Sequence, residues 1–188
     1  MTPTHKLLPL AVLAAVTFAA CDDDDPIIEA PNEEELITTV TLVLTSGSDV
    51  VTFTQVDLDG DGGTDATVTG GSLAAGTTYD YAVTFLNATE TPPEDITVEV
   101  REEDEEHQVF VAFEGVAATL ADQDLDDDGR PLGVTGEITV ADTASGSGFL
   151  TVTLVHEPNK DAAGVADGDI TNAGGETDVE ARFPVDIR

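Results

Sequence analysis

Period-two alternation of apolar and polar residues is the feature that most limits how this chain of 188 residues can fold. The clearest case is the C-terminal segment 179–187, in which every second residue is apolar and most of the residues between them are polar. Successive side chains of a β-strand point to opposite faces, so this pattern gives a strand with one apolar face. The segment is therefore predicted to be a strand that covers a hydrophobic core.

Similar segments recur along the chain and predict an all-β fold. The expected strands are 36–45, 50–56, 66–69, 79–85, 109–113, 117–121, 134–140, 149–156 and 179–187. Ser46–Asp49 is turn-forming, so the first two strands are expected to form a hairpin. Eight or nine short strands predict an antiparallel β-sandwich of immunoglobulin-like type, and a β-barrel is the alternative.

One short helix is predicted between residues 91 and 106. Ile96, Val98 and Val100 alternate as in a strand, but the prolines and acidic residues at the start of the segment are typical of a helix N-terminus. Residues 33–188 are expected to form a single domain, because the chain has 40% apolar residues and its length suits one core. With no tryptophan and only two tyrosines, that core is expected to depend on valine, leucine and isoleucine.

The N-terminus has the plan of a secretory leader. Residues 1–20 contain Lys6, no acidic residue and an apolar run from Leu7 to Ala20. That run is shorter than the roughly 20 residues a membrane-spanning helix needs. Cys21 is the only cysteine, and it follows two alanines as in a bacterial lipobox, in which the cysteine is acylated. We therefore predict a signal peptide over 1–20 and a lipid anchor on Cys21; ordinary secretion without an anchor is the alternative.

An acidic run, Asp22–Asp25, follows the predicted anchor, and residues 21–32 have the composition of a tether. The run resembles the acidic export signal of Bacteroidota-type lipoproteins, which implies display on the outer face of the outer membrane. A plain solvated spacer on a periplasm-facing anchor is the alternative. The membrane is accordingly an expected partner, through the lipid anchor.

The net charge limits the possible ligands. Residues 21–188 contain all 39 acidic residues and five basic ones, which gives a net charge of −34. Such a charge repels nucleic acid, so nucleic-acid binding is not expected. It attracts multivalent cations. Acidic residues distributed along the whole chain are, however, also typical of a protein that stays soluble in concentrated salt.

Two aspartate-rich loops are candidate calcium sites. Asp57, Asp59 and Asp61 occupy positions 1, 3 and 5 of an EF-hand-like loop, glycine is at position 6 and Asp65 at position 9. Position 12 is Val68, which excludes a true EF-hand. A weaker copy contains Asp124, Asp126 and Asp128. Calcium is thus the one cofactor that these spacings suggest, and ordinary acidic turns are the alternative.

The two histidines after the leader, His107 and His156, offer another metal site. Both are expected at strand ends, and each follows or precedes a glutamate. If the two strand ends are adjacent, the imidazoles and a carboxylate could bind zinc or copper. The competing interpretation is that both are ordinary residues at the rim of the sandwich.

Four stretches, 32–38, 106–110, 156–160 and 168–178, resemble a family of small Bacteroidota outer-membrane lipoproteins. Members are often assigned a type 1 periplasmic-binding fold, whereas this chain lacks the length and the repeated βαβ units for two α/β lobes. The resemblance implies an envelope location and an accessory role for an outer-membrane transporter.

Sequence motifs of catalysis are missing. The chain has no G-x-S-x-G or H-E-x-x-H motif and no phosphate-binding glycine loop. We therefore predict a non-enzymatic binding or structural module on the membrane, with metal handling as the alternative function.

Overall fold

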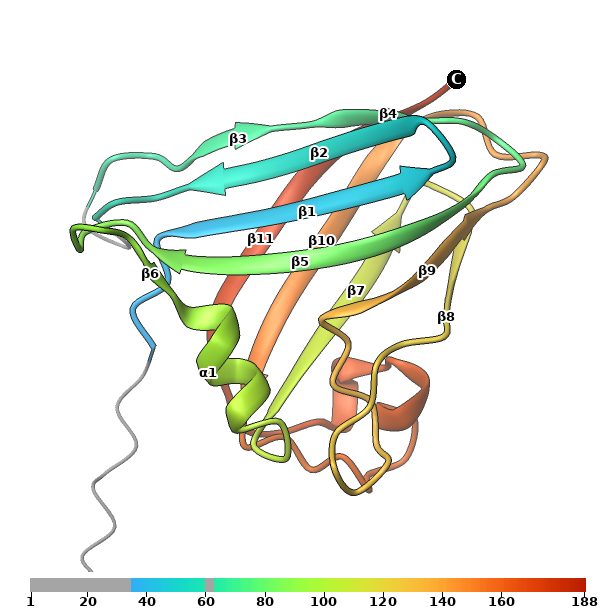
Figure 1. Cartoon of the computed structure of the whole chain (residues 1–188). Helices are drawn as coiled ribbons and strands as arrows, with labels where there is room; N and C mark the ends of the chain where they lie inside the picture. The colour runs from blue at the N-terminus through green and yellow to red at the C-terminus, as the bar shows by residue number, and fades with distance from the viewer. Residues whose placement is uncertain (1–34, 60–62) are drawn as a thin grey trace, which may run out of the picture. The chain divides into compact units, whose positions relative to one another are not determined.

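Two β-sheets face each other and enclose the core in the computed structural model, which describes residues 35–59 and 63–188 (Figure 1). The prediction of an all-β sandwich is confirmed. Both sheets belong to one compact unit. The predicted leader, Cys21 and the acidic run lie outside the described residues.

The first sheet has the strand order β3-β2-β1-β5-β9-β8, and β6 pairs with β5. Its strands are β1 (Thr39–Ser46), β2 (Asp49–Val56), β3 (Thr67–Thr69), β5 (Thr78–Asn87), β6 (Glu94–Asp95), β8 (Ala118–Ala121) and β9 (Thr135–Val140). The predicted hairpin is confirmed, because β1 and β2 pair antiparallel from Thr39 opposite Val56 to Ser46 opposite Asp49.

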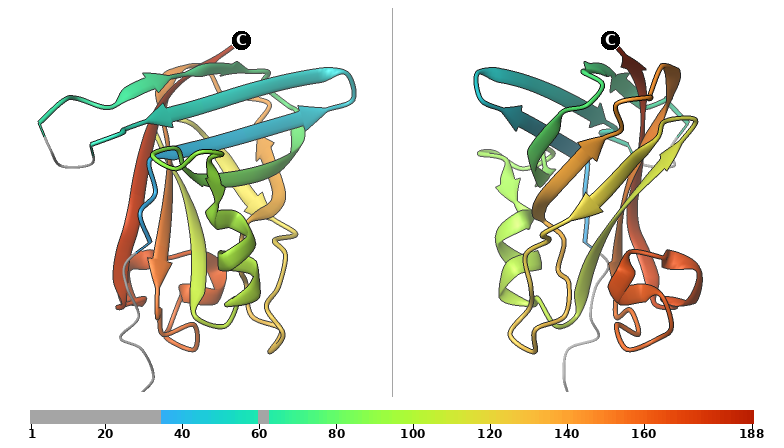
Figure 2. Two further views of the ribbon diagram at one scale, coloured as in Figure 1. Left: turned by 60° about the vertical axis from the view of Figure 1, so that its left-hand side comes forward. Right: turned by 90° about the vertical axis from the view of Figure 1, so that its right-hand side faces the viewer.

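The second sheet has the order β4-β11-β10-β7. Its strands are β4 (Gly71–Leu73), β7 (His107–Glu114), β10 (Gly146–His156) and β11 (Glu176–Ile187). β4 pairs parallel with β11, whereas the other pairs are antiparallel. Figures 1 and 2 show that the strands of this sheet cross those of the first sheet at a large angle.

The core lies between the inner faces of the two sheets. In β1 the buried residues Val40, Leu42 and Leu44 alternate with partly exposed ones, as the period-two pattern predicts. Phe53 of the first sheet and Phe183 of the second have ring centroids 5.7 Å apart. The expected reliance on aliphatic residues was therefore incomplete, because the largest fully buried side chains include Tyr79 and three phenylalanines.

The predicted short helix is present as α1 (Ile96–Glu102). Its N-cap is Asp95, whose side chain accepts a hydrogen bond from the amide of Thr97 at 3.1 Å. The Thr97 hydroxyl in turn bonds the backbone of Phe85, which fixes the helix to β5. Among the described residues, no helix is long and apolar enough to cross a bilayer.

Candidate metal centre

The two histidines lie side by side at one end of the second sheet. His107 begins β7, His156 ends β10, and the antiparallel register places them directly opposite each other. Their rings are stacked, with centroids 4.8 Å apart and planes inclined by 21°. The pairing of β7 with β10 thus brings together two residues that are far apart in the sequence.

Both rings lie on the core-facing side of the sheet. The next inward positions of the two strands hold the opposed residues Val109 and Leu154, which are fully buried in the main core. Side chains two residues apart share a face of a strand, so His107 and His156 continue this core surface. Their exposed fractions are 0% and 7%.

A third candidate ligand, Asp178, lies at an irregularity in β11. Val179 pairs with Leu154 and Thr177 pairs with Val155, so Asp178 is the extra residue of a β-bulge. A bulge redirects side chains that a regular strand would place alternately on its two faces. The Asp178 carboxylate lies 3.9 Å from Nε2 of His107, and one ligand atom of each of His107, His156 and Asp178 lies within 4.8 Å of the others.

The tautomer of His107 favours metal binding. Its Nδ1 lies 3.1 Å from the carbonyl oxygen of Glu103, which can only accept, so Nδ1 carries the proton. Nε2 then has a free lone pair, and it is buried without a hydrogen-bond partner. Burial lowers the pKa of His107 and so favours the neutral ring, although the bond to Glu103 opposes this effect. Metal-binding histidines are typically oriented by such a bond from the other ring nitrogen.

Further carboxylates surround this centre. Glu106 Oε2 lies 3.9 Å from Nε2 of His156. Glu35, Glu99 and Glu103 form a second group whose ligand atoms lie within 4.8 Å of one another. Burial, followed by repulsion from Glu99 and Glu103, raises the pKa of Glu35 to about 7. The region therefore has an excess of negative charge that a bound cation would relieve.

The raised pKa of Glu35 gives a testable pH dependence. The folded state binds the proton of the Glu35 carboxyl group more tightly than the unfolded state does. The stabilisation of the fold by this proton is therefore complete below pH 4.5 and is lost as the pH rises through about 7. We expect Glu35→Gln to increase the free energy of unfolding by about 1 kcal/mol at pH 8, a value reduced for partial solvent screening, and to leave it unchanged at pH 4. Urea denaturation at both pH values measures this, and an equal effect at both would contradict it.

No protein-family model, curated protein or solved structure matches this chain. The resemblance to a lipoprotein family therefore stays a prediction.

The second aspartate-rich loop is occupied by the protein's own cations. Arg101 pairs with Asp124 at 3.0 Å, and Lys160 pairs with the buried Asp126 at 2.9 Å. Arg130 pairs with Asp128 at 2.6 Å. Within the described residues, none of the three aspartates belongs to a group of ligands close enough to hold a metal ion. We therefore do not propose calcium at Asp124, Asp126 and Asp128, because these carboxylates already have positive partners.

The first aspartate-rich loop is described only in part. Asp57, Asp59 and Asp65 lie between β2 and β3 and line a hollow of about 380 Å³. Asp61 lies outside the described residues. Calcium binding at this loop stays a prediction from spacing.

Sequence reasoning identified His107 and His156 but missed Asp178. The two histidines were recognisable because they are the only ones after residue 20 and both were expected at strand ends. Asp178 lies in a long polar segment, and no local pattern marks it as the residue of a bulge.

Proposed function

We propose that this protein is a lipid-anchored metal-binding protein of the cell envelope, which holds a divalent transition-metal ion, zinc foremost, between His107, His156 and Asp178. The observation that carries the proposal is the buried Nε2 of His107, which has no hydrogen-bond partner and faces a carboxylate 3.9 Å away. Leaving such an atom without a partner destabilises a fold unless a ligand compensates.

The donor set favours zinc or Cu²⁺ over other ions. Two imidazole nitrogens and one carboxylate oxygen suit these metals, whereas Cu⁺ prefers sulfur ligands and Ca²⁺ takes six or more oxygens. Zinc bonds of about 2.1 Å require donors about 3.4 Å apart in a tetrahedral site. Because the ligand atoms already lie within 4.8 Å of one another, side-chain movements of about an ångström would suffice.

Burial of the ligands suits retention of the ion better than catalysis. The side chains of His107 and Asp178 both have an exposed fraction of 0%. A catalytic zinc site keeps a position open to substrate, whereas this one is covered. The proposed role is therefore to sequester the ion at the envelope. The protein would be attached through Cys21 and displayed at the cell surface, as an accessory of an outer-membrane transporter.

Metal titration tests this function. We expect the metal-free protein to bind one zinc ion per chain in competition with a chromophoric chelator. At a free zinc concentration 100 times the dissociation constant, the stability should rise by about 2.7 kcal/mol. His107→Gln and Asp178→Asn should each weaken binding at least tenfold.

The matched control is Asp80→Asn, which removes the same charge as Asp178→Asn from an exposed position on β5. It should leave zinc affinity unchanged. Magnesium at the same ionic strength controls for general screening of the −34 charge. Equal zinc affinity in the wild-type protein and in both ligand variants would disprove the proposal.

A further inference from the structure

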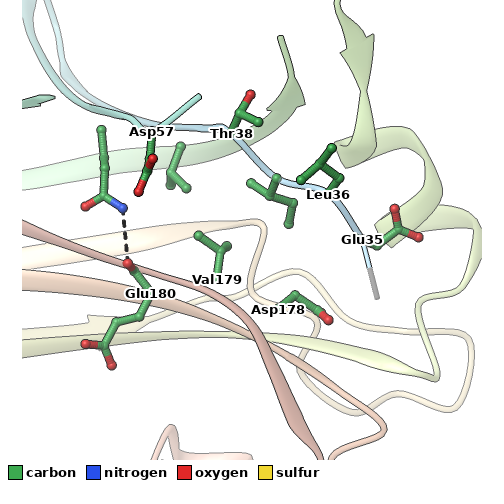
Figure 3. Close-up of a pocket in the computed structure, with 10 residues that line it drawn as sticks. Glu35, Leu36, Thr38, Asp57, Asp178, Val179 and Glu180 are labelled. Carbon is green, nitrogen blue, oxygen red and sulfur yellow. Dashed lines mark hydrogen bonds between the residues drawn. The ribbon is translucent and has the colours of Figure 1, made fainter. Parts of the chain in front are cut away.

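A hollow of about 320 Å³ lies next to the metal centre, and Asp178 lines it. Its other walls come from the segment that leads into β1, from the end of β2 and from the start of β11 (Figure 3). The side chain of Gln55, which also lines the hollow, donates a hydrogen bond of 3.2 Å to the carbonyl oxygen of Glu180. This bond joins β2 of the first sheet to β11 of the second.

Carboxylates lie at both ends of this hollow. Figure 3 shows Asp57 at one end, Glu35 and Asp178 at the other, and Val179 between them. Leu36 adds apolar surface to the wall, and none of the described residues that line the hollow is a lysine, arginine or histidine. Its shape and charge therefore suit a ligand with positive ends and an apolar middle.

Asp57 is the anchor of the first end. Its Oδ1 is buried and has no hydrogen-bond partner. Such a carboxylate oxygen calls for a donor, and a primary ammonium group supplies three N–H donors together with a positive charge. Among the described residues, Asp57 belongs to neither group of side chains close enough to hold a metal ion. The ammonium group of an organic cation would supply the missing donor at this end.

We propose that this hollow binds a linear aliphatic diamine, with one ammonium on Asp57, the other at Glu35 and Asp178, and the methylene chain against Leu36 and Val179. This site goes beyond the proposed metal function, because Asp57 takes no part in the metal centre. When zinc occupies Asp178, Glu35 still offers a carboxylate to the second ammonium.

A series of diamines of increasing length tests the proposal. The full chain, freed of metal, is titrated by calorimetry at pH 8 and 150 mM NaCl with each diamine from 1,3-diaminopropane to 1,8-diaminooctane. We expect binding of one diamine per chain with an optimum at one chain length. The best diamine should bind at least tenfold more tightly than the monoamine of the same length, because the monoamine lacks the second charge.

Two variants assign the binding to this hollow. Asp57→Asn should weaken the best diamine at least tenfold, and Asp80→Asn, which removes an exposed charge elsewhere, should leave it unchanged. Glu35→Gln provides a second, independent variant in case Asp57→Asn perturbs the loop. The proposal fails if affinity shows no length optimum, or if Asp57→Asn and Asp80→Asn have equal effects, since either result indicates general attraction by the acidic surface.

The metal function and the diamine site can fail separately. His107→Gln removes a proposed zinc ligand but does not line the hollow. Diamine binding should therefore persist in this variant while zinc binding is lost.

Discussion

Replacing Lys160 with alanine is expected to lower the free energy of unfolding by about 3 to 5 kcal/mol. The Lys160 ammonium donates to the Asp126 carboxylate at 2.9 Å and to the carbonyl oxygen of Asp104 at 2.6 Å. The exposed fractions of the Lys160 and Asp126 side chains are 4% and 0%. The substitution therefore leaves a buried carboxylate without its positive partner, and urea denaturation measures the cost.

A surface pair provides the control for this effect. Arg101 and Asp124 lie 3.0 Å apart, but 44% of the Arg101 side chain is exposed. Arg101→Ala should thus cost less than about 1 kcal/mol. Combining Lys160→Met with Asp126→Asn removes both buried charges and keeps an oxygen that accepts from the amides of Asp128 and Arg130, so it should restore most of the stability lost in Lys160→Ala. Equal losses in Lys160→Ala and Arg101→Ala would contradict this account of the pair.

The Lys160–Asp126 pair also makes the stability of the fold depend on pH in the acid range. Burial alone would raise the pKa of Asp126, but hydrogen bonds from Lys160 and from the backbone of Arg130 outweigh it and lower that pKa below 3.8. The contribution of the ionised Asp126 carboxylate to stability is therefore complete when the pH is above the ordinary pKa of an aspartate. It is lost as the pH falls below that value towards the lowered pKa of the folded state.

The features predicted from the sequence are those that local patterns determine. Period-two alternation identified the inward-facing residues of β1, and the turn at Ser46–Asp49 identified the hairpin. Strand pairing at long range was not predictable in this way. The adjacency of His107 and His156 depends on the register between β7 and β10, which a single sequence leaves open. The bulge at Asp178 is harder still to predict, because a bulge is defined by the pairing of β11 with its partner strand β10.

The two aspartate-rich loops show the same limit. Asp57 and Asp126 both belong to loops with calcium-like spacing. In the folded protein Asp126 binds Lys160, which lies 34 residues away, whereas Asp57 lines a hollow whose other described lining residues include no basic one. The spacing of the aspartates along the sequence identifies loops rich in carboxylates. It does not show whether lysine or arginine side chains from distant segments pair with those carboxylates, and such pairing determines which loop can accept a ligand.

Gly175→Ala is expected to disturb both the fold and the metal centre. Gly175 has a φ of +70°, which L-residues rarely adopt, and a Cβ atom there would overlap the carbonyl oxygen of His156. The left-handed conformation costs about 1 to 2 kcal/mol, and the backbone overlap should raise the total to about 3 kcal/mol. Because relief of the overlap must move the end of β10, His156 should shift as well. We expect zinc affinity to fall at least tenfold.

The neighbouring glycine separates conformational strain from displacement of His156. Gly174 also has a positive φ, of +61°, but a Cβ atom there meets no atom within 4 Å. Gly174→Ala should therefore cost only the strain of about 1 to 2 kcal/mol and should leave zinc affinity unchanged. Urea denaturation and zinc titration of the two variants measure both quantities. Similar zinc affinities in Gly174→Ala and Gly175→Ala would show that the position of His156 is not what holds the ion, because only the second substitution presses on its backbone.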